Sequence, residues 1–322
     1  MSETNKINRI ISTNLSKINS IIIDDVDKIN SILLTPGSIT GNPYAIFGFG
    51  VAGSTNYVAM TNLVSNTGVV ATDVAGVGTA RRGLAATGYG GDKAIFAYGH
   101  NSSYQTLSNL VSNTGVVATD VAGVGTERHY LAAAGYGGDK GIFGYGYNGS
   151  NFSLTNLVSN TGVVATDTTG VGTARYLLAA ADYGGDKAIF AYGYTGSQSS
   201  ISNLVSNTGV VSNNTSGVGT ARIGLAAAGY GGDKAIFGYG GYPEMSVTNL
   251  VSNTGVIATD TTGVGTNRMN LAATKYGSDK AIFGYGENFY SMTNLVSNTG
   301  VVATDTTGVG TGRNALAAAS FG

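Results

Sequence analysis

Residues 62–68 read Asn-Leu-Val-Ser-Asn-Thr-Gly, and this heptad begins again at Asn109, Asn156, Asn203, Asn249 and Asn294. The starts are separated by 47, 47, 47, 46 and 45 residues, so the chain carries six copies of one unit. A second marker, Gly-Thr-any residue-Arg, recurs at the same spacing. It places one arginine in each copy, here called the marker arginine: Arg81, Arg128, Arg175, Arg222, Arg268 and Arg313. Units of this length are typical of β-propeller blades.

Each copy divides into four short apolar segments separated by turn residues. In residues 175–215 these are an Ala-rich segment ending at Ala181, then Lys187 to Tyr192, Ile201 to Ser206, and a segment that starts at Val210. Gly-Gly-Asp and Asn-Thr-Gly supply the residues that tight hairpins need. One small sheet cannot bury both of its faces, whereas six sheets packed around an axis can. We therefore predict an all-β fold for residues 37–322, a six-bladed β-propeller of four-stranded antiparallel blades.

The two ends of the repeat array are incomplete in a complementary way. The first copy lacks its Ala-rich strand and starts at Tyr44, and the last copy is an Ala-rich strand alone, residues 313–321. Pairing of the C-terminal strand with the N-terminal strands completes the sixth blade and removes the exposed sheet edges.

Residues 1–36 hold a different repeat, with Lys-Ile-Asn at residues 6–8, 17–19 and 28–30. Its eleven-residue apolar period favours a helix with one apolar side. The content of Asn, Ser and Thr, which are poor helix formers, leaves a β-structured segment open. We expect this segment to anchor the chain to partner proteins or to form a homo-oligomer.

The composition narrows the function. The net charge is −1 with scattered basic residues, so we expect no nucleic-acid binding. No apolar run has the length of a membrane span, so we expect no membrane insertion. There is no cysteine, and the two histidines, His100 and His129, fall in different copies. We therefore expect no metal centre, no cofactor and no catalytic triad, and we predict that the protein is not an enzyme.

Two charged positions recur in the repeat. We interpret the six marker arginines as a structural ring, each satisfying turn carbonyls or an aspartate, with a ligand-binding ring as the alternative. A second shared position holds an acidic residue in five copies, and Asn214 replaces it in the fourth, so inter-blade ion pairs are expected but not obligatory: Asp73, Asp120, Asp167, Asp260 and Asp305.

The copies differ mainly in the connection after the second strand and in the residues after the marker arginine. In a four-stranded meander both places emerge on the same side, so we expect a variable recognition face opposite the near-identical turns. The candidate binding residues on that face are Tyr57, His100, Tyr104, His129, Tyr130, Tyr147, Phe152, Tyr194, Tyr242, Glu244, Phe289 and Tyr290.

The repeat unit resembles kelch-like repeats over residues 41–322. An arginine leads the Ala-rich strand, and an Ile-Phe-Gly-Tyr-Gly strand stands where kelch repeats have a double glycine. The chain has no Trp, so kelch partners are not carried over. The near-identical repeat sequence, Asn-Leu-Val-Ser-Asn-Thr-Gly-Val-Val-Ala-Thr-Asp at residues 156–167, also resembles that of the kelch-like repeat proteins of tailed bacteriophages, especially marine and cyanobacterial ones.

This resemblance implies a virion protein that is assembled in the host cytoplasm and binds other virion proteins through residues 1–36. Three functions remain open. The first is a tail fibre or adhesin that presents the variable face to a host-surface glycan or protein. The second is a head or tail decoration protein without a receptor. The third is a soluble lectin-like propeller with glycan sites between its blades. The aromatic residues of the variable loops argue against it, because they do not recur at the same position in each copy.

Overall fold

A computed structural model describes residues 43–322, which all belong to one compact unit, Gly41–Gly322. These residues form twenty strands and one short 3-10 turn, η1 (Glu287–Phe289), and they contain no α-helix. The all-β prediction is confirmed for this part of the chain. The predicted N-terminal segment, residues 1–36, lies outside the described residues.

Most of the strands form three-stranded antiparallel sheets, six in all among the described residues. The first sheet consists of β20 (Ala317–Ser320), β1 (Pro43–Gly48) and β4 (Thr61–Ser65), the second of β5 (Ala85–Tyr89), β6 (Lys93–Ala97) and β7 (Ser108–Val111). The third consists of β8 (Ala132–Tyr136), β9 (Lys140–Tyr147) and β10 (Asn151–Val158), the fourth of β11 (Ala179–Tyr183), β12 (Lys187–Tyr194) and β13 (Gln198–Val205). The fifth consists of β14 (Ala226–Tyr230), β15 (Lys234–Gly238) and β16 (Thr248–Val251), the sixth of β17 (Ala272–Tyr276), β18 (Lys280–Gly286) and β19 (Tyr290–Val296). A short hairpin of β2 (Val51–Ala52) and β3 (Asn56–Tyr57) extends the first sheet's loop.

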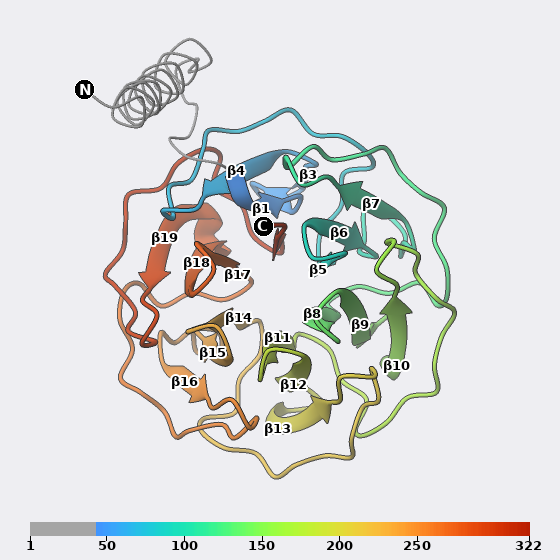
Figure 1. The fold of residues 1–322 in the computed structure, drawn as a ribbon. Coiled ribbons are helices and arrows are strands. Elements are labelled where there is room, and N and C mark those ends of the chain that lie inside the picture. The colour runs from blue at the N-terminus through green and yellow to red at the C-terminus, as the bar shows by residue number, and fades with distance from the viewer. Residues whose placement is uncertain (1–42) are drawn as a thin grey trace, which may run out of the picture. The chain divides into compact units, whose positions relative to one another are not determined.

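The sheets follow one another around a common centre, with the Ala-rich strand of each sheet innermost (Figure 1). Neighbouring innermost strands contact each other in the order β5, β8, β11, β14, β17, β20, and β20 also contacts β5. Alanine suits this position because the space between sheets narrows toward the centre.

The first and last parts of the described chain share one sheet. Strand β20 pairs antiparallel with β1, with Ala45 opposite Ser320 and Gly48 opposite Ala317. Strand β4 pairs with the other side of β1, so β1 is the central strand of that sheet.

The prediction of four strands in each sheet is wrong. Residues after the Asn-Thr-Gly turn make isolated bridges instead, as at Val64–Val70 and Thr61–Val74. The two chain segments that connect these bridges differ in length, so the pairing contains a bulge. The side-chain amide of Asn62 fills this gap, because it donates to the Ala71 carbonyl and to Asp73 Oδ1, both at 2.9 Å. A side chain thus replaces part of the backbone ladder.

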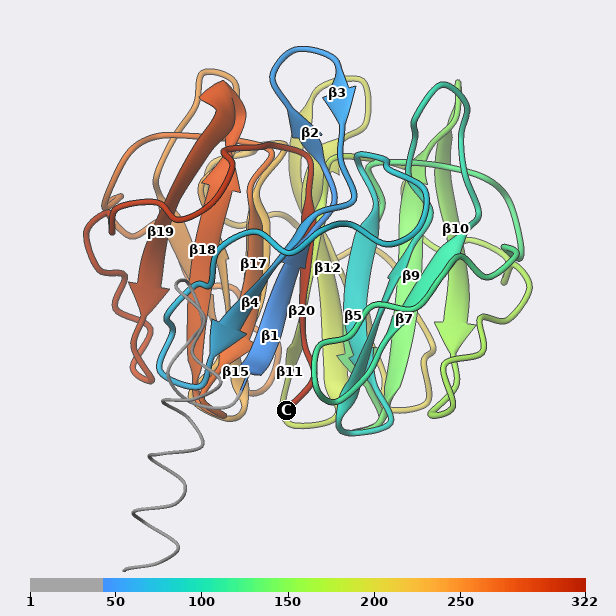
Figure 2. The same cartoon turned by 90° about the horizontal axis from the view of Figure 1, so that it is seen from above.

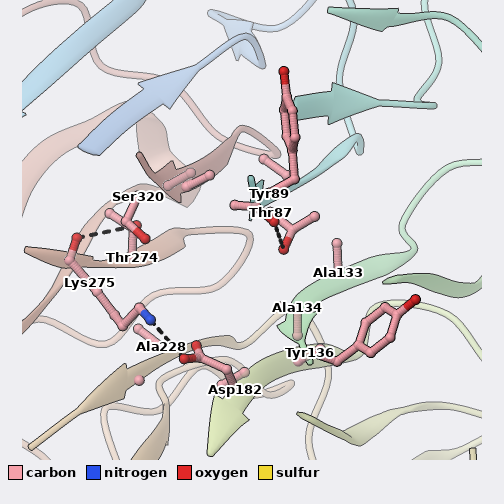
Figure 3. Close-up of a pocket in the computed structure, with 18 of the residues that line it drawn as sticks. Thr87, Tyr89, Ala133, Ala134, Tyr136, Asp182, Ala228, Thr274, Lys275 and Ser320 are labelled. Carbon is pink, nitrogen blue, oxygen red and sulfur yellow. Dashed lines mark hydrogen bonds and ion pairs between the residues drawn. The ribbon is translucent and has the colours of Figure 1, made fainter. Parts of the chain in front are cut away.

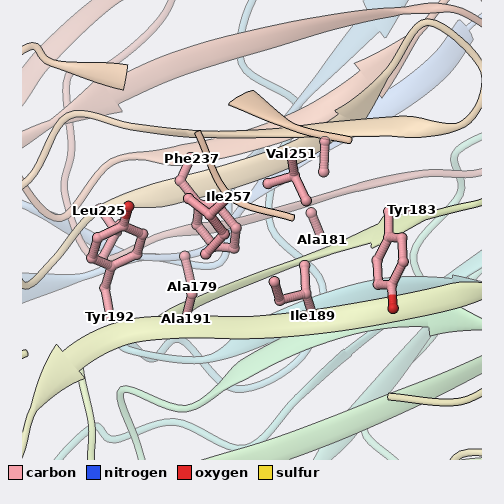
Figure 4. Close-up of a cluster of buried hydrophobic side chains, with 11 residues drawn as sticks. Ala179, Ala181, Tyr183, Ile189, Ala191, Tyr192, Leu225, Phe237, Val251 and Ile257 are labelled. Carbon is pink, nitrogen blue, oxygen red and sulfur yellow. The ribbon is translucent and has the colours of Figure 1, made fainter. Parts of the chain in front are cut away.

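The core consists of side chains packed between neighbouring sheets. One such cluster contains Ile189 of β12 together with residues of the next sheet, among them Phe237 of β15 and Val251 of β16, and all three are fully buried (Figure 4). Burial of a side chain of this size contributes about 1.5–3 kcal/mol. Five further clusters of the same composition lie between the other sheets among the described residues.

The sheets present two different edges, seen from the side in Figure 2. The edge that carries the Gly-Gly-Asp and Asn-Thr-Gly turns is called the turn edge. The two kinds of turn contact each other there, and Asn113 Nδ2 donates a hydrogen bond to Asp92 Oδ2. We call the loop edge the opposite one. It carries the β2–β3 hairpin, the loops between the second and third strands, and the residues that follow each marker arginine.

A cyclic set of backbone hydrogen bonds links the six repeats at the centre of the loop edge. Each member donates its N–H to the carbonyl of the member before it, and Gly83 donates to Ala315 at 2.8 Å. All members have positive φ, from 50° to 62°. We call this set the amide ring, and its members are Gly83, Tyr130, Leu177, Gly224, Asn270 and Ala315.

Candidate functional site

The six marker arginines lie between the sheets and are fully buried. Arg81 is typical: Nε donates to the Tyr98 carbonyl at 2.7 Å, Nη1 to the Thr79 carbonyl at 2.9 Å and Nη2 to Asn109 Oδ1 at 2.7 Å. Its guanidinium also stacks 4.5 Å from the ring of Phe49 in the preceding sheet. Burial lowers the pKa of Arg81 to about 10, so the side chain is still charged at neutral pH. The marker arginines are therefore occupied by contacts within the protein.

The recurring aspartates bind the segment that leads into the innermost strand of their own sheet. Asp120 accepts hydrogen bonds from the Thr79 N–H at 3.0 Å and from Thr79 Oγ1 at 2.6 Å. Asp73 makes the same contacts with Thr311, which joins the first repeat to the last. Burial acts to raise the pKa of Asp73, but the hydrogen bonds from Thr311 and Asn62 outweigh it and lower this pKa.

The expectation of ion pairs between blades is wrong, because each marker guanidinium lies near the aspartate of its own sheet. The shortest distances between these groups are 3.6–4.0 Å. In the fourth repeat Asn214 Oδ1 accepts from the Thr173 N–H, and Asn214 Nδ2 donates to Thr173 Oγ1. Hydrogen-bond geometry rather than charge is thus the shared property of this position.

A cavity of about 180 Å³ lies at the centre of the turn edge, lined by the innermost strands (Figure 3). One position of each repeat faces it: Gly88, Gly135, Asp182, Gly229, Lys275 and Ser320. Lys275 Nζ lies 2.7 Å from Asp182 Oδ2. A Cβ on Gly229 would lie 2.9 Å from Lys275 Cδ and 3.1 Å from Asp182 Oδ1, so the glycine between them leaves room for this ion pair.

A second cavity of about 70 Å³ lies at the loop edge, lined by a leucine from each repeat and by the amide ring. It shares no lining residue with the first cavity. The leucines are Leu84, Leu131, Leu178, Leu225, Leu271 and Leu316, and all of them are buried. None of the side chains that line this cavity is charged.

The loop edge carries a continuous row of aromatic rings from four neighbouring sheets. Consecutive ring centroids lie 4.3–6.4 Å apart. We call this row the aromatic arc, and it consists of Tyr57, His100, Tyr104, His129, Tyr130, Tyr147, Tyr176 and Tyr194. All but His129 are partly exposed, so the arc offers ring surface to a partner.

The arc forms because the two variable places of each repeat are paired. The residue after the marker arginine bridges the residue that follows the aromatic-Gly pair at the end of the second strand, as in Arg82–His100, His129–Tyr147 and Tyr176–Tyr194. Tyr176 and Arg82 were missed as site residues by sequence reasoning. The signal that could have found them is this pairing, since each pair is separated by a constant 18 residues in the sequence.

The other predicted site residues lie apart from the arc. Tyr242 is 76% exposed and Phe289 is 38% exposed, and neither makes a ring contact among the described residues. The Tyr242 backbone exchanges hydrogen bonds with the Gln198 side chain. Phe152, Glu244 and Tyr290 are partly exposed loop-edge residues. The structure therefore brings together seven of the twelve predicted binding residues and leaves five outside: Phe152, Tyr242, Glu244, Phe289 and Tyr290.

Both histidines of the arc are held in the neutral form. Burial lowers the pKa of His129 to about 4, and the charge of Arg82 acts in the same direction. Burial and the charge of Arg82 also lower the pKa of His100. His129 Nδ1 lies 3.0 Å from the Tyr147 carbonyl, which fixes the proton on this nitrogen in the neutral ring.

Within residues 43–322 no helix has the length and apolar character to cross a membrane, and no three acidic or histidine side chains are placed to hold a metal ion. No protein-family model matches the chain, and no curated protein matches it. The geometry of the loop edge is therefore the main guide to function.

Proposed function

We propose that residues 43–322 are a closed six-bladed β-propeller. Four sets of contacts support it, because each recurs in all six repeats and returns from the last repeat to the first. These are the amide ring, the aspartate or asparagine contacts to threonine, the stacking of each marker arginine on an aromatic ring, and the contacts between innermost strands. A medium-resolution cryo-EM map that shows five or seven blades, or an open ring, would contradict the proposal.

The function that the loop edge supports best is host-surface recognition by a non-enzymatic bacteriophage virion protein, a tail fibre or adhesin component. The observation that carries it is the aromatic arc. Its residues occupy the two places where the repeats differ, while the core and the turn edge repeat with little change. Aromatic side chains supply large contact areas at low entropic cost, which suits recognition. The resemblance of the blades to phage kelch-like repeat proteins supports the virion location.

Two matched double variants test this function. Tyr104→Ser with Tyr176→Ser removes two rings of the arc, and Tyr242→Ser with Phe289→Ser removes two aromatic rings elsewhere on the loop edge. We expect the first variant to reduce binding of labelled full-length protein to host cells at least about tenfold, since losses of 1–2 kcal/mol per aromatic contact are usual. We expect the second to bind as the unchanged protein does. Equal binding by all three proteins would favour a decoration protein.

Residues 1–36 are the proposed attachment to other virion proteins. Deletion of residues 1–36 should leave a folded propeller and prevent incorporation into particles, measured by mass spectrometry of purified virions. Incorporation at the normal level would contradict the anchoring role. A lectin-like protein outside the virion is the alternative, and neighbouring genes for capsid and tail proteins would count against it.

A further inference from the structure

We propose that Arg82 and the aromatic arc form a subsite for a carboxylate-bearing sugar of a surface polysaccharide. The inference rests on the proposed recognition function of the loop edge and specifies its ligand. It starts from one side chain that the repeat does not explain.

Among the arginines and lysines of residues 43–322, Arg82 is the one whose side chain has no acidic or hydrogen-bonding partner. The marker arginines bind carbonyls and asparagines within the core. Every described lysine is paired with an aspartate. The Arg82 guanidinium makes no hydrogen bond or ion pair, and its Nε is buried without a partner. A guanidinium without a partner in the chain is free to form charge-assisted hydrogen bonds with an anionic group of a ligand.

The surroundings of Arg82 define what that anion carries. Arg82 and His100 are bridged through their backbones, and the Arg82 guanidinium lies 5.8 Å from the centre of the Tyr57 ring. His100 Nδ1 is also buried without a partner, and the His100 ring contacts Tyr104 at 5.2 Å. The cation therefore stands beside the arc, next to Tyr57 and His100 and close enough to act electrostatically on Tyr130. Aromatic rings pack against the apolar C–H face of a pyranose, while the guanidinium donates hydrogen bonds to the acidic substituent of the sugar.

The charge at the subsite matches a single negative charge. Because both histidines are neutral at pH 7, Arg82 is the positive group there, and the described lysines belong to the turn edge or the central cavity. One planar guanidinium binds one carboxylate through two parallel hydrogen bonds. A phosphate dianion would retain unneutralised charge beside apolar rings, which is unfavourable. The length of the arc, which crosses four sheets, fits several consecutive sugar units rather than one.

Binding of three small sugars to the full-length protein tests the proposal by calorimetry or ligand-observed NMR at pH 7. These are methyl β-D-glucuronide with a carboxylate, methyl β-D-glucoside without charge, and glucose 6-phosphate. We expect the glucuronide to bind about tenfold more tightly than the glucoside, the usual effect of one charge-assisted hydrogen-bonding pair. Equal binding of glucuronide and glucoside, or tighter binding of the phosphate, would overturn the proposal.

Variants assign the preference to the subsite. Arg82→Gln should reduce glucuronide binding to the glucoside level and leave the glucoside unchanged, and Arg82→Lys should keep part of the preference. Tyr104→Ala should weaken both sugars, whereas Tyr242→Ser on the same edge should change neither. Retention of the preference in Arg82→Gln would contradict the assignment. Loss of sugar selectivity with cell binding intact overturns this inference alone, and loss of cell binding in the arc variant remains the separate test of the recognition function.

Discussion

Arg81 and Arg82 are adjacent in the sequence and belong to two regions that behave differently. Arg81 is part of the repeated interior, where its guanidinium is fully buried and makes three hydrogen bonds. Arg82 is part of the loop edge, where its guanidinium makes none. The backbone next to the marker arginines nevertheless keeps part of this pairing in other repeats, because Gly241 and Glu287 each donate one hydrogen bond, to Ile223 and Met269, where His100 and Arg82 exchange two. The repeat thus fixes the backbone of the interior and leaves both loop lengths and side chains free to vary at the loop edge.

Removal of residues 313–322 breaks the interior most severely. It takes away β20, the marker arginine of the last repeat and the Ala315 member of the amide ring, and it exposes one side of β1. We expect loss of cooperative unfolding in calorimetry and aggregation in size-exclusion chromatography. Removal of residues 1–36 is the matched control and should leave the unfolding transition in place. A shortened chain that melts like the full-length protein would contradict closure through β20.

Substitution of the two neighbouring arginines separates the regions directly. Arg81→Gln should lower the free energy of unfolding by about 3–5 kcal/mol, because the Asn109 side chain and two carbonyls lose a buried charged donor. Arg82→Gln should change it by no more than about 0.5 kcal/mol. Chemical denaturation of both variants measures the difference. Similar losses in the two variants would show that Arg82 is also structural.

Acid should weaken the protein through His129 before it affects the aspartates. The pKa of His129 is lowered to about 4 in the folded protein from 6.5, so the unfolded chain binds the proton more readily between these values. This contribution is fully present above pH 6.5 and is lost as the pH falls toward 4, by roughly 3 kcal/mol in total. Denaturation of the unchanged protein and of His129→Gln at several pH values checks this. An identical pH dependence in both would contradict it.

The smallest effect is expected in the central cavity, where one ion pair departs from the repeat. Asp182 and Lys275 side chains remain 30% and 36% exposed, so solvent screens the pair and Asp182→Asn should cost less than about 1 kcal/mol. The charge of Asp182 raises the pKa of Lys275, so the contribution holds at neutral pH and is lost as the pH rises through this raised pKa. Denaturation at pH 7 and pH 11 should show the difference shrinking. A difference that grows at pH 11 would contradict this sign.

The sequence predicted the all-β class and the strand positions because turn glycines and apolar segments recur in all six copies. The prediction of a fourth strand was wrong, because the sequence does not show that the Asn62 side chain binds Ala71 and Asp73 in place of a backbone ladder. Sequence reasoning found seven residues of the aromatic arc from loop variation alone. It missed Arg82 and Tyr176 because their importance depends on cross-strand pairing and on the absence of partners, and both are properties of the folded chain.

The amide ring has an electrostatic consequence. Each peptide group carries a dipole of about 3.5 D, and in a helix these dipoles add along one axis. In the amide ring each member donates the N–H of the peptide group before it and accepts at the C=O of the peptide group after it, so twelve peptide groups surround the centre, from Gly83 through Ala315 and back to Gly83. Because six similar repeats surround one centre, the dipole components that lie in the plane of the ring cancel. The amide ring therefore adds no sideways pull on an approaching ligand, and the charges of Arg82 and Glu287, which act on Tyr130 in opposite directions, set the field there.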